Sequence, residues 1–159
     1  MSVDVFLQSL TLFLPILLAN QAGMIAQLFH LPFSTMPVSR RLLGENKTIA
    51  VYYVAPVLAG VVVFLYQDNY WYREALVFGW GAVLGDHVKS FVKRRLGFKP
   101  GDPWIFDRID FAIGGALAAK CYFAWVTFEH VFWIVAIALP VHYLGNQVGF
   151  ILGLRKTPH

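Results

Sequence analysis

Charged residues are scarce in this 159-residue chain. Only 14% of its residues are charged and 58% are apolar, whereas a typical soluble domain has about a quarter charged residues. This balance argues against a water-soluble globular enzyme and against a disordered segment. The single cysteine, Cys121, excludes an internal disulfide and a cysteine metal cluster. The composition therefore favours the lipid bilayer as the solvent.

Five apolar stretches come close to the roughly 20 residues that a helix needs to cross a bilayer. They are Val3–Phe29, Ile49–Tyr66, Ala75–Val92, Ile109–Val126 and Val131–Leu154. The first stretch has no basic segment before it and is longer than the apolar part of a signal peptide, so we expect a retained helix. The sequence predicts an all-α polytopic membrane protein with five transmembrane helices, forming a single domain over residues 1–159.

The basic residues gather at one set of helix ends. Most of the 13 lysines and arginines lie between the first and second stretches, around the junction of the third and fourth, or after the fifth. The positive-inside rule then places the N-terminus outside, and both basic loops and the C-terminus in the cytoplasm. The same placement accounts for the net charge of +4, so we expect no nucleic-acid partner.

Acidic residues are concentrated after the third stretch. Asp102 and Pro103 are typical of a helix start, which would put Asp107 and Asp110 on one face of the same helix. Two interpretations stay open for these carboxylates. They either pair with nearby basic residues such as Lys93–Arg95, or they hold Mg²⁺ while the basic residues bind phosphate.

Asp86 lies at the cytoplasmic end of the third stretch and is a third candidate metal ligand. The alternative is an ion pair with Lys89 or Lys93, one or two helical turns further along. We expect the neighbouring His87 to be a hydrogen-bonding residue of the interface rather than a metal ligand.

Polar residues outside this segment are weaker candidates. Lys47 and Thr48 come just before the second stretch, where helix amides and a cation can receive phosphate. The residues before them look like part of a phosphate-binding loop, but the glycine required directly before the lysine is missing. Asn20 lies near the inner end of the first stretch, where interhelical hydrogen bonding is the usual role of such a residue.

One motif is specific. The pattern S-x-x-K-R-x4-K followed by D-R-x-D is met by Ser90, Lys93, Arg94, Lys99, Asp107, Arg108 and Asp110. These residues resemble the CTP-transferase membrane family, which includes phosphatidate cytidylyltransferase and the shorter CDP-archaeol synthases. The length of the chain and its closing segment Gly153–Lys156 are similar to the shorter branch. Pro100, where the longer enzymes have an acid, and the missing H-G-G loop depart from the longer branch.

The resemblance implies a Mg²⁺-dependent enzyme, a nucleotidyltransferase that joins CTP to a membrane lipid phosphate at the cytoplasmic face of the cell membrane. The lipid implied is an ether-linked isoprenoid glycerol phosphate, and the products are CDP-archaeol and pyrophosphate. Two alternatives remain: a phosphatidate cytidylyltransferase that makes CDP-diacylglycerol, and a non-enzymatic protein that binds or transports lipid phosphates. A CDP-alcohol phosphotransferase would need an aspartate spacing that the chain lacks.

The candidate site residues fall into three groups. The predicted catalytic residues are Asp107, Asp110, Lys93 and Arg94. The predicted metal ligands are Asp86, Asp107 and Asp110. The residues expected to bind CTP and its phosphates are Asn20, Lys47, Thr48, Ser90, Lys93, Arg94, Arg95 and Lys99.

Overall fold

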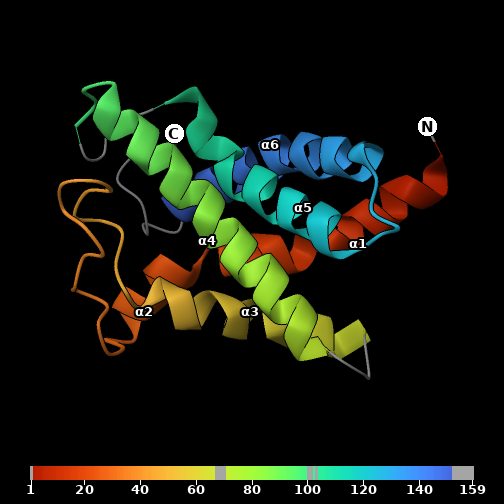
Figure 1. The fold of residues 1–159 in the computed structure, drawn as a ribbon, viewed down its shortest axis with the longest axis horizontal. Coiled ribbons are helices and arrows are strands. Elements are labelled where there is room, and N and C mark those ends of the chain that lie inside the picture. The colour runs from red at the N-terminus through yellow and green to blue at the C-terminus, as the bar shows by residue number, and fades with distance from the viewer. Residues whose placement is uncertain (1, 67–70, 100–101, 103, 152–159) are drawn as a thin grey trace.

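The computed structural model describes residues 2–66, 71–99, 102 and 104–151, and these residues contain helices and no strand. The elements are α1 (Val3–Ala19), α2 (Ala22–Leu28), α3 (Val51–Tyr66), α4 (Trp71–Arg95), the 3₁₀ turn η1 (Ile105–Arg108), α5 (Asp110–Tyr122) and α6 (Phe128–Ile151). Figure 1 shows α4 as a long diagonal helix with α3 on one side and α5 on the other. The predicted all-α class is confirmed over these residues.

The five apolar stretches all contain helix, but the first is not one continuous helix. Asn20 and Gln21 separate α1 from α2, so the expectation of a single helix over Val3–Phe29 is wrong. Hydropathy alone could not reveal the break, because apolar residues continue on both sides of it. Taken together, Val3–Leu28 is still apolar and long enough to cross a membrane, as is Phe128–Gly145.

Small residues let the central helices approach closely. A side chain at Gly85 in α4 would fall on the backbone of Asp110 and Gly114 in α5, and a side chain at Gly79 would meet Pro56 in α3. Glycine at helix contacts permits this backbone approach in membrane proteins. The C-terminal half of α4 is thereby held against the first turn of α5.

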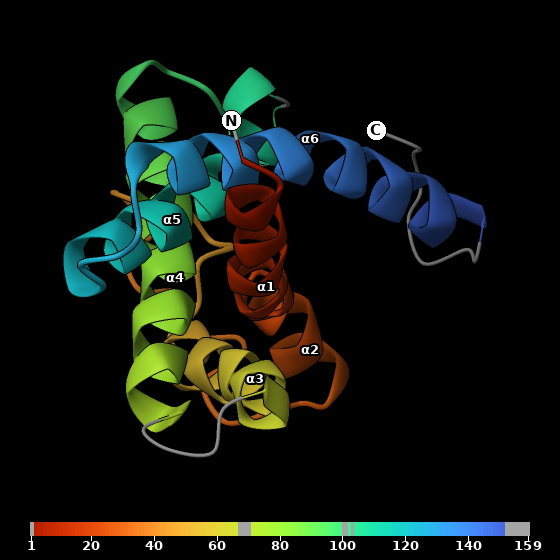
Figure 2. The ribbon, with the colours of Figure 1, turned by 90° about the vertical axis from the view of Figure 1, so that its right-hand side faces the viewer.

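The remaining helices complete the bundle. Helix α1 packs against α3, α4, α5 and α6, with Phe13 and Ile16 fully buried in the core. Figure 2 shows α6 crossing over the other helices, with its C-terminal part extending beyond them. The core therefore lies between α1, α3, α4 and α5 and the first half of α6.

The expected helix start at Asp102 and Pro103 is wrong. The carboxylate of Asp102 accepts a hydrogen bond from the backbone N–H of Lys99 at 2.6 Å, so it closes a turn instead of capping a helix; Pro103 lies outside the described residues. Helical structure resumes only at Ile105, where η1 begins. Ile109, with φ −131°, separates η1 from α5, and Asp107 and Asp110 consequently belong to different elements.

The loop between α2 and α3 is closed at its base. Pro37 and Thr48 form an isolated antiparallel bridge, in which Val38 N–H donates to the Lys47 carbonyl at 2.7 Å and Ile49 N–H donates to the Met36 carbonyl at 2.9 Å. This closure fixes the backbone of Lys47 immediately before α3.

Candidate active site

Three aspartates converge on one ammonium group. The Nζ atom of Lys89 lies 3.2 Å from Asp86 Oδ1, 3.0 Å from Asp107 Oδ1 and 2.7 Å from Asp110 Oδ2. The three acids come from α4, η1 and the first turn of α5, which the close packing of α4 on α5 brings together. The structure thus gathers all the predicted metal ligands around a lysine.

Two further lysines flank these acids. Lys47 Nζ lies 2.5 Å from Asp86 Oδ2, although 39 positions separate the two residues. Lys93 Nζ lies 3.0 Å from Asp107 Oδ2 and also donates to the Asp102 carbonyl. The Asp–Lys cluster, as we call it, consists of Lys47, Asp86, Lys89, Lys93, Asp107 and Asp110. Its formal charges balance.

Asp107 is held in its ionised form. Burial alone would raise the pKa of its carboxyl group, but hydrogen bonds from Lys89 and Lys93 outweigh that effect and lower it, with a contribution from the Trp104 N–H. That N–H donates to Asp107 Oδ2 at 2.7 Å. Hydrogen bonds to the charged form of a carboxyl group stabilise that form, so Asp107 is a carboxylate at neutral pH.

A polar cavity of about 190 Å³ lies between the first loop and the C-terminal half of α4. Its lining includes Lys47, Lys89, Ser90, Lys93, Arg94 and Asp107. Arg94 uses Nη2 to donate to the Lys99 carbonyl at 3.1 Å, while its Nε and Nη1 have no hydrogen-bond partner among the described residues. These two nitrogens carry three N–H donors, which remain available to a ligand.

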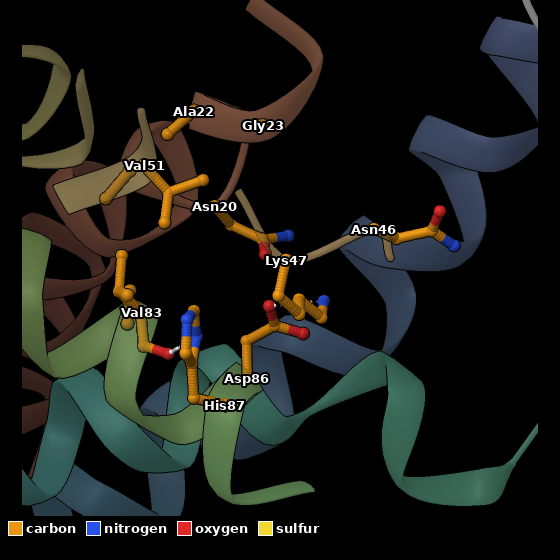
Figure 3. Close-up of a pocket in the computed structure, with 11 residues that line it drawn as sticks. Asn20, Ala22, Gly23, Asn46, Lys47, Val51, Val83, Asp86 and His87 are labelled. Carbon is orange, nitrogen blue, oxygen red and sulfur yellow. Dashed lines mark hydrogen bonds and ion pairs between the residues drawn. The ribbon is translucent and has the colours of Figure 1, made fainter. Parts of the chain in front are cut away.

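A second polar cavity, of about 120 Å³, lies on the other side of Lys47. Figure 3 shows Asn20 directed toward the ion pair of Lys47 and Asp86, with His87 below them. His87 is buried, and its Nδ1 lies 2.8 Å from the Val83 carbonyl. A carbonyl can only accept, so Nδ1 carries the proton of this hydrogen bond. His87 is thus a hydrogen-bonding residue, as the sequence predicts.

Three of the predicted phosphate-binding residues line neither polar cavity. Thr48 is buried at the bridge that closes the first loop. The guanidinium of Arg95 lies over the Phe91 ring, 4.9 Å from its centroid, and Lys99 is exposed. The structure brings together Asn20, Lys47, Ser90, Lys93 and Arg94 around the Asp–Lys cluster and leaves these three outside it.

An apolar groove of about 420 Å³ begins at the other side of the cluster. It runs between α4, η1 and α5, and its apolar lining includes Leu84, Val88, Val92, Phe106, Ile113 and Leu117. Lys89 and Asp110 also line it. Lys89 is the residue common to this groove and the 190 Å³ cavity. At Leu84 the groove meets a further hollow along α4 and α5 of about 470 Å³, which reaches Arg73 and Tyr122.

Lys89 is the residue of the cluster that the sequence did not single out, because it was considered only as an ion-pair partner of Asp86. The spacing of Lys89 from its neighbours in the sequence could have indicated its place in the cluster. Lys89 is three residues after Asp86 and four before Lys93, so all three side chains fall on one face of a helix. A helical face with an acid and two lysines next to the D-R-x-D segment would have placed Lys89 inside the site.

The donor chemistry of the cluster fits a hard divalent cation, because carboxylate oxygens are the ligands that Mg²⁺ takes from proteins. Asp110 Oδ2 is buried and lies 2.7 Å from Lys89 Nζ, so this oxygen faces the centre of the cluster. The described residues contain no group of three acidic, cysteine or histidine side chains already arranged to hold a metal ion. The carboxylates instead surround Lys89.

The chain is similar to proteins of known function over most of its length. The sequence pattern of the CarS-like CDP-archaeol synthase family matches residues 69–159. A CDP-archaeol synthase of Aeropyrum pernix is 33% identical over 165 residues, covering 98% of this chain and 94% of that protein. Another, from Methanopyrus kandleri, is 38% identical over 126 residues, covering 75% of this chain and 72% of that protein.

The fold agrees with these relatives. A solved structure, described as an intramembrane enzyme for archaeal membrane lipid biosynthesis, superposes with a TM-score of 0.71 at 28% sequence identity. The similarity covers 89% of this chain and 94% of the other. Together with the apolar helices, this similarity identifies a membrane protein, and it leaves the non-enzymatic alternative without support. The chain belongs to the CDP-archaeol synthase family and is an enzyme of the nucleotidyltransferase class.

Proposed function

We propose that this protein is a Mg²⁺-dependent cytidylyltransferase that joins CTP to an ether-linked isoprenoid glycerol phosphate such as digeranylgeranylglyceryl phosphate. The products are a CDP-archaeol and pyrophosphate. One observation carries the proposal: the Asp–Lys cluster lies between a cation-lined polar cavity and an apolar groove, and Lys89 lines both. A water-soluble nucleotide and a membrane lipid can therefore meet at this point.

The 190 Å³ cavity suits the triphosphate of CTP. Lys47, Lys93 and Arg94 line it, and two guanidinium nitrogens of Arg94 have no partner among the described residues. Charge-assisted hydrogen bonds from such groups to phosphate oxygens are among the stronger polar contacts in proteins. Asn20 and His87, which line the adjoining 120 Å³ cavity, are the candidates to contact the rest of the nucleotide.

The apolar groove suits the hydrocarbon chains of the lipid. Its lining is largely aliphatic and aromatic, and its polar end carries Lys89 and Asp110. A lipid whose chains lie along α4 and α5 has its phosphate at that end. Burial of apolar surface supplies the affinity for the chains, while the ammonium group attracts the phosphate.

Asp86, Asp107 and Asp110 are the residues that would hold Mg²⁺. A bound divalent cation neutralises phosphate charge and stabilises the charge that develops during phosphoryl transfer. The proposal of this cofactor rests on the carboxylate oxygens that three different elements bring together around one point.

The reaction requires no covalent intermediate with the protein. An oxygen of the lipid phosphate attacks the α-phosphorus of CTP, forming a new P–O bond. The bond from the α-phosphorus to the oxygen that bridges it to the β-phosphorus breaks, and pyrophosphate leaves with the electron pair. The attacking oxygen is already anionic, so the side chains contribute alignment and countercharge instead of a general base. Lys93 and Arg94 are placed to offset the charge of the departing pyrophosphate.

We further propose that the five apolar segments cross the cell membrane with the N-terminus outside, so that the Asp–Lys cluster faces the cytoplasm. The basic residues at the end of α4 lie beside the cluster, and cytoplasmic ends of membrane helices are the ends that carry lysine and arginine. CTP then reaches the site from water, while the lipid phosphate lies at the depth of the headgroups.

The test is turnover of labelled CTP by the purified protein with Mg²⁺. We expect labelled CDP-lipid with digeranylgeranylglyceryl phosphate, less product with phosphatidate, and none without lipid or with EDTA in place of Mg²⁺. The Asp107→Asn variant is the matched inactive control. Preference for phosphatidate would identify CDP-diacylglycerol as the product instead, and absence of any CDP-lipid would overturn the proposed function.

A further inference from the structure

Lys89 occupies an unusual position for a lysine. Its ammonium contacts carboxylates from three different elements at 2.7 to 3.2 Å, and only 13% of its side chain is exposed. Lys47 and Lys93 each form an ion pair with one of these aspartates, Lys47 with Asp86 and Lys93 with Asp107. Lys89 is thus the cation that joins all three acids.

Asp110 depends on this cation more than the other acids do. It is 6% exposed, and its Oδ2 lies 2.7 Å from Lys89 Nζ, whereas Asp86 and Asp107 each have a second lysine beside them. A buried carboxylate without a nearby positive charge is costly. Some cation must therefore lie beside Asp110 whenever its carboxylate is charged.

We propose that Lys89 is the resident countercation of the metal-free site, and that its ammonium and a divalent cation compete for the carboxylates of Asp86, Asp107 and Asp110. This inference rests on the metal site of the proposed function. The ammonium lies within contact of all three acids, so a divalent cation that binds them must displace it. Because the Lys89 side chain lines both the polar cavity and the apolar groove, the displaced ammonium stays beside the phosphates of both substrates.

The balanced charge of the cluster also stabilises the site before a ligand binds. Three aspartates brought together without a central cation would repel each other and weaken the contact of η1 and α5 with α4. With Lys89 between them they are held in place before any ligand arrives, so the site is organised in advance. If Lys89 only held the helices together, replacing it would change the affinity for a metal ion slightly, by the loss of one positive charge from the protein.

The test is thermal unfolding of the purified full chain in detergent micelles, with MgCl₂ varied and no substrate present. Ligands that bind the folded state raise its melting temperature by an amount that grows with the logarithm of ligand concentration above the dissociation constant. Fitting this dependence gives the Mg²⁺ concentration that half-fills the site, which we call the Mg²⁺ midpoint. We expect Lys89→Met to melt below wild type without Mg²⁺ and to have a Mg²⁺ midpoint about tenfold lower or less, because a competing charge a few ångströms away has been removed. Lys89→Arg, which keeps the charge, should need as much Mg²⁺ as wild type or more.

Lys120→Met is the matched control. Lys120 is in the last turn of α5, at the end away from Asp110, with Nζ 5.6 Å from the centroid of the Phe128 ring; its loss removes the same charge without touching the cluster. Its Mg²⁺ midpoint should equal that of wild type. If Lys89→Met does not fold, Lys89→Gln gives the same comparison, since glutamine keeps a hydrogen-bond donor but carries no charge.

An unchanged or higher Mg²⁺ midpoint in the uncharged Lys89 variant would overturn the competition, as would the absence of any Mg²⁺ shift in that variant. A shift in the variant alone would support it, because wild type would then hold its own cation too tightly to be displaced without substrate. The outcome is separable from the proposed function. If wild type turns over CTP but the Mg²⁺ midpoint of the Lys89 variant is unchanged, Lys89 does not compete with Mg²⁺, while the proposed enzyme activity is supported.

Discussion

Lys93 holds both oxygens of the Asp107 carboxylate. Its Nζ lies 3.1 Å from Oδ1 and 3.0 Å from Oδ2, and the N–H of Trp104, the residue before η1, donates to the same carboxylate. The acid is therefore fixed in position and in its charged form. An asparagine at this position keeps the shape but presents an NH₂ group where one oxygen now faces a cation. Replacing Asp107 with asparagine therefore tests whether the charge of this carboxylate is needed for activity.

We expect Asp107→Asn and Asp110→Asn each to lower kcat by about 100-fold or more, a magnitude typical of losing one electrostatic contact to a transition state. Both variants should still be inserted in the membrane. Asp4→Asn, an exposed change in the first turn of α1, is the control and should retain wild-type rates. Steady-state kinetics at saturating Mg²⁺ provide the measurement, and near-wild-type rates in both variants would contradict the assigned role.

Arg94→Lys should raise the KM for CTP or lower kcat by about tenfold. The change keeps the charge but removes the planar set of donors, and a charge-assisted hydrogen bond contributes about 1.5–3 kcal/mol. The KM for the lipid should stay the same. Arg40→Lys, at an exposed arginine of the first loop, is the matched control. Kinetics with CTP varied at saturating lipid, then the reverse, separate the two substrates; unchanged CTP parameters would remove Arg94 from the nucleotide site.

Val88→Trp should raise the KM for the lipid while leaving the KM for CTP unchanged. Val88 lines the apolar groove and is 63% exposed, so an indole there fills part of the groove without disturbing the core. Val57→Trp provides the control, because Val57 in α3 is also 63% exposed and does not line the groove. Equal effects of the two variants on lipid kinetics would show that the lipid does not occupy the groove.

Gly114→Ala should lower the free energy of unfolding by about 1–3 kcal/mol, the usual cost of overpacking a close contact. A Cβ atom there would lie 2.6 Å from the Gly85 Cα atom in α4, so the two helices would have to separate. Gly145→Ala is the contrasting variant, since no described residue outside its own helical backbone and chain neighbours lies within 4 Å of its Cβ position. Alanine should be neutral or stabilising there. Melting temperatures in detergent test this, and a Gly114→Ala protein as stable as wild type would contradict it.

A cysteine at Ser39, with Cys121→Ala in the background, should react with a membrane-impermeant thiol reagent only from the cytoplasmic side. Ser39 lies in the basic first loop, so the proposed orientation places it in the cytoplasm. Tyr72→Cys, near the opposite end of α4, should react from outside. Labelling of intact cells and of inverted vesicles makes the comparison. Reaction of the Ser39 variant in intact cells would reverse the orientation.

The helices and part of the membership of the site were predictable, because each depends on short-range pattern. Apolar runs indicate helices directly. The motif supplies several residues that the structure brings together, namely Ser90, Lys93, Arg94, Asp107 and Asp110, but it also includes Lys99, which lines neither polar cavity. The Asp102 turn was predicted wrongly because aspartate before proline is typical both of a helix start and of a tight turn. Only the contact of Asp102 with Lys99 decides between them.

The centre of the site could not be predicted, because it depends on how distant segments meet. The approach of Lys47 to Asp86 requires the path of the first loop, and the convergence of three acids on Lys89 requires the register of α4 against α5. The glycines at positions 85 and 114 indicate that two helices pack closely. They do not indicate which residues of α4 and α5 lie opposite each other. The expectation of a metal named the three acids that the structure brings together and overlooked the lysine that lies among them.

The bridge between Pro37 and Thr48 fixes the position of Lys47 independently of the length of the first loop. The base of the loop is tied by backbone hydrogen bonds, and doubling the length of such a closed ring costs only about 0.6 kcal/mol in closure entropy. Leu43, Gly44 and Asn46 line the 190 Å³ cavity, so the second half of the loop is constrained by the site. An insertion next to Arg40 or Arg41, before these residues, lengthens the ring without moving Lys47.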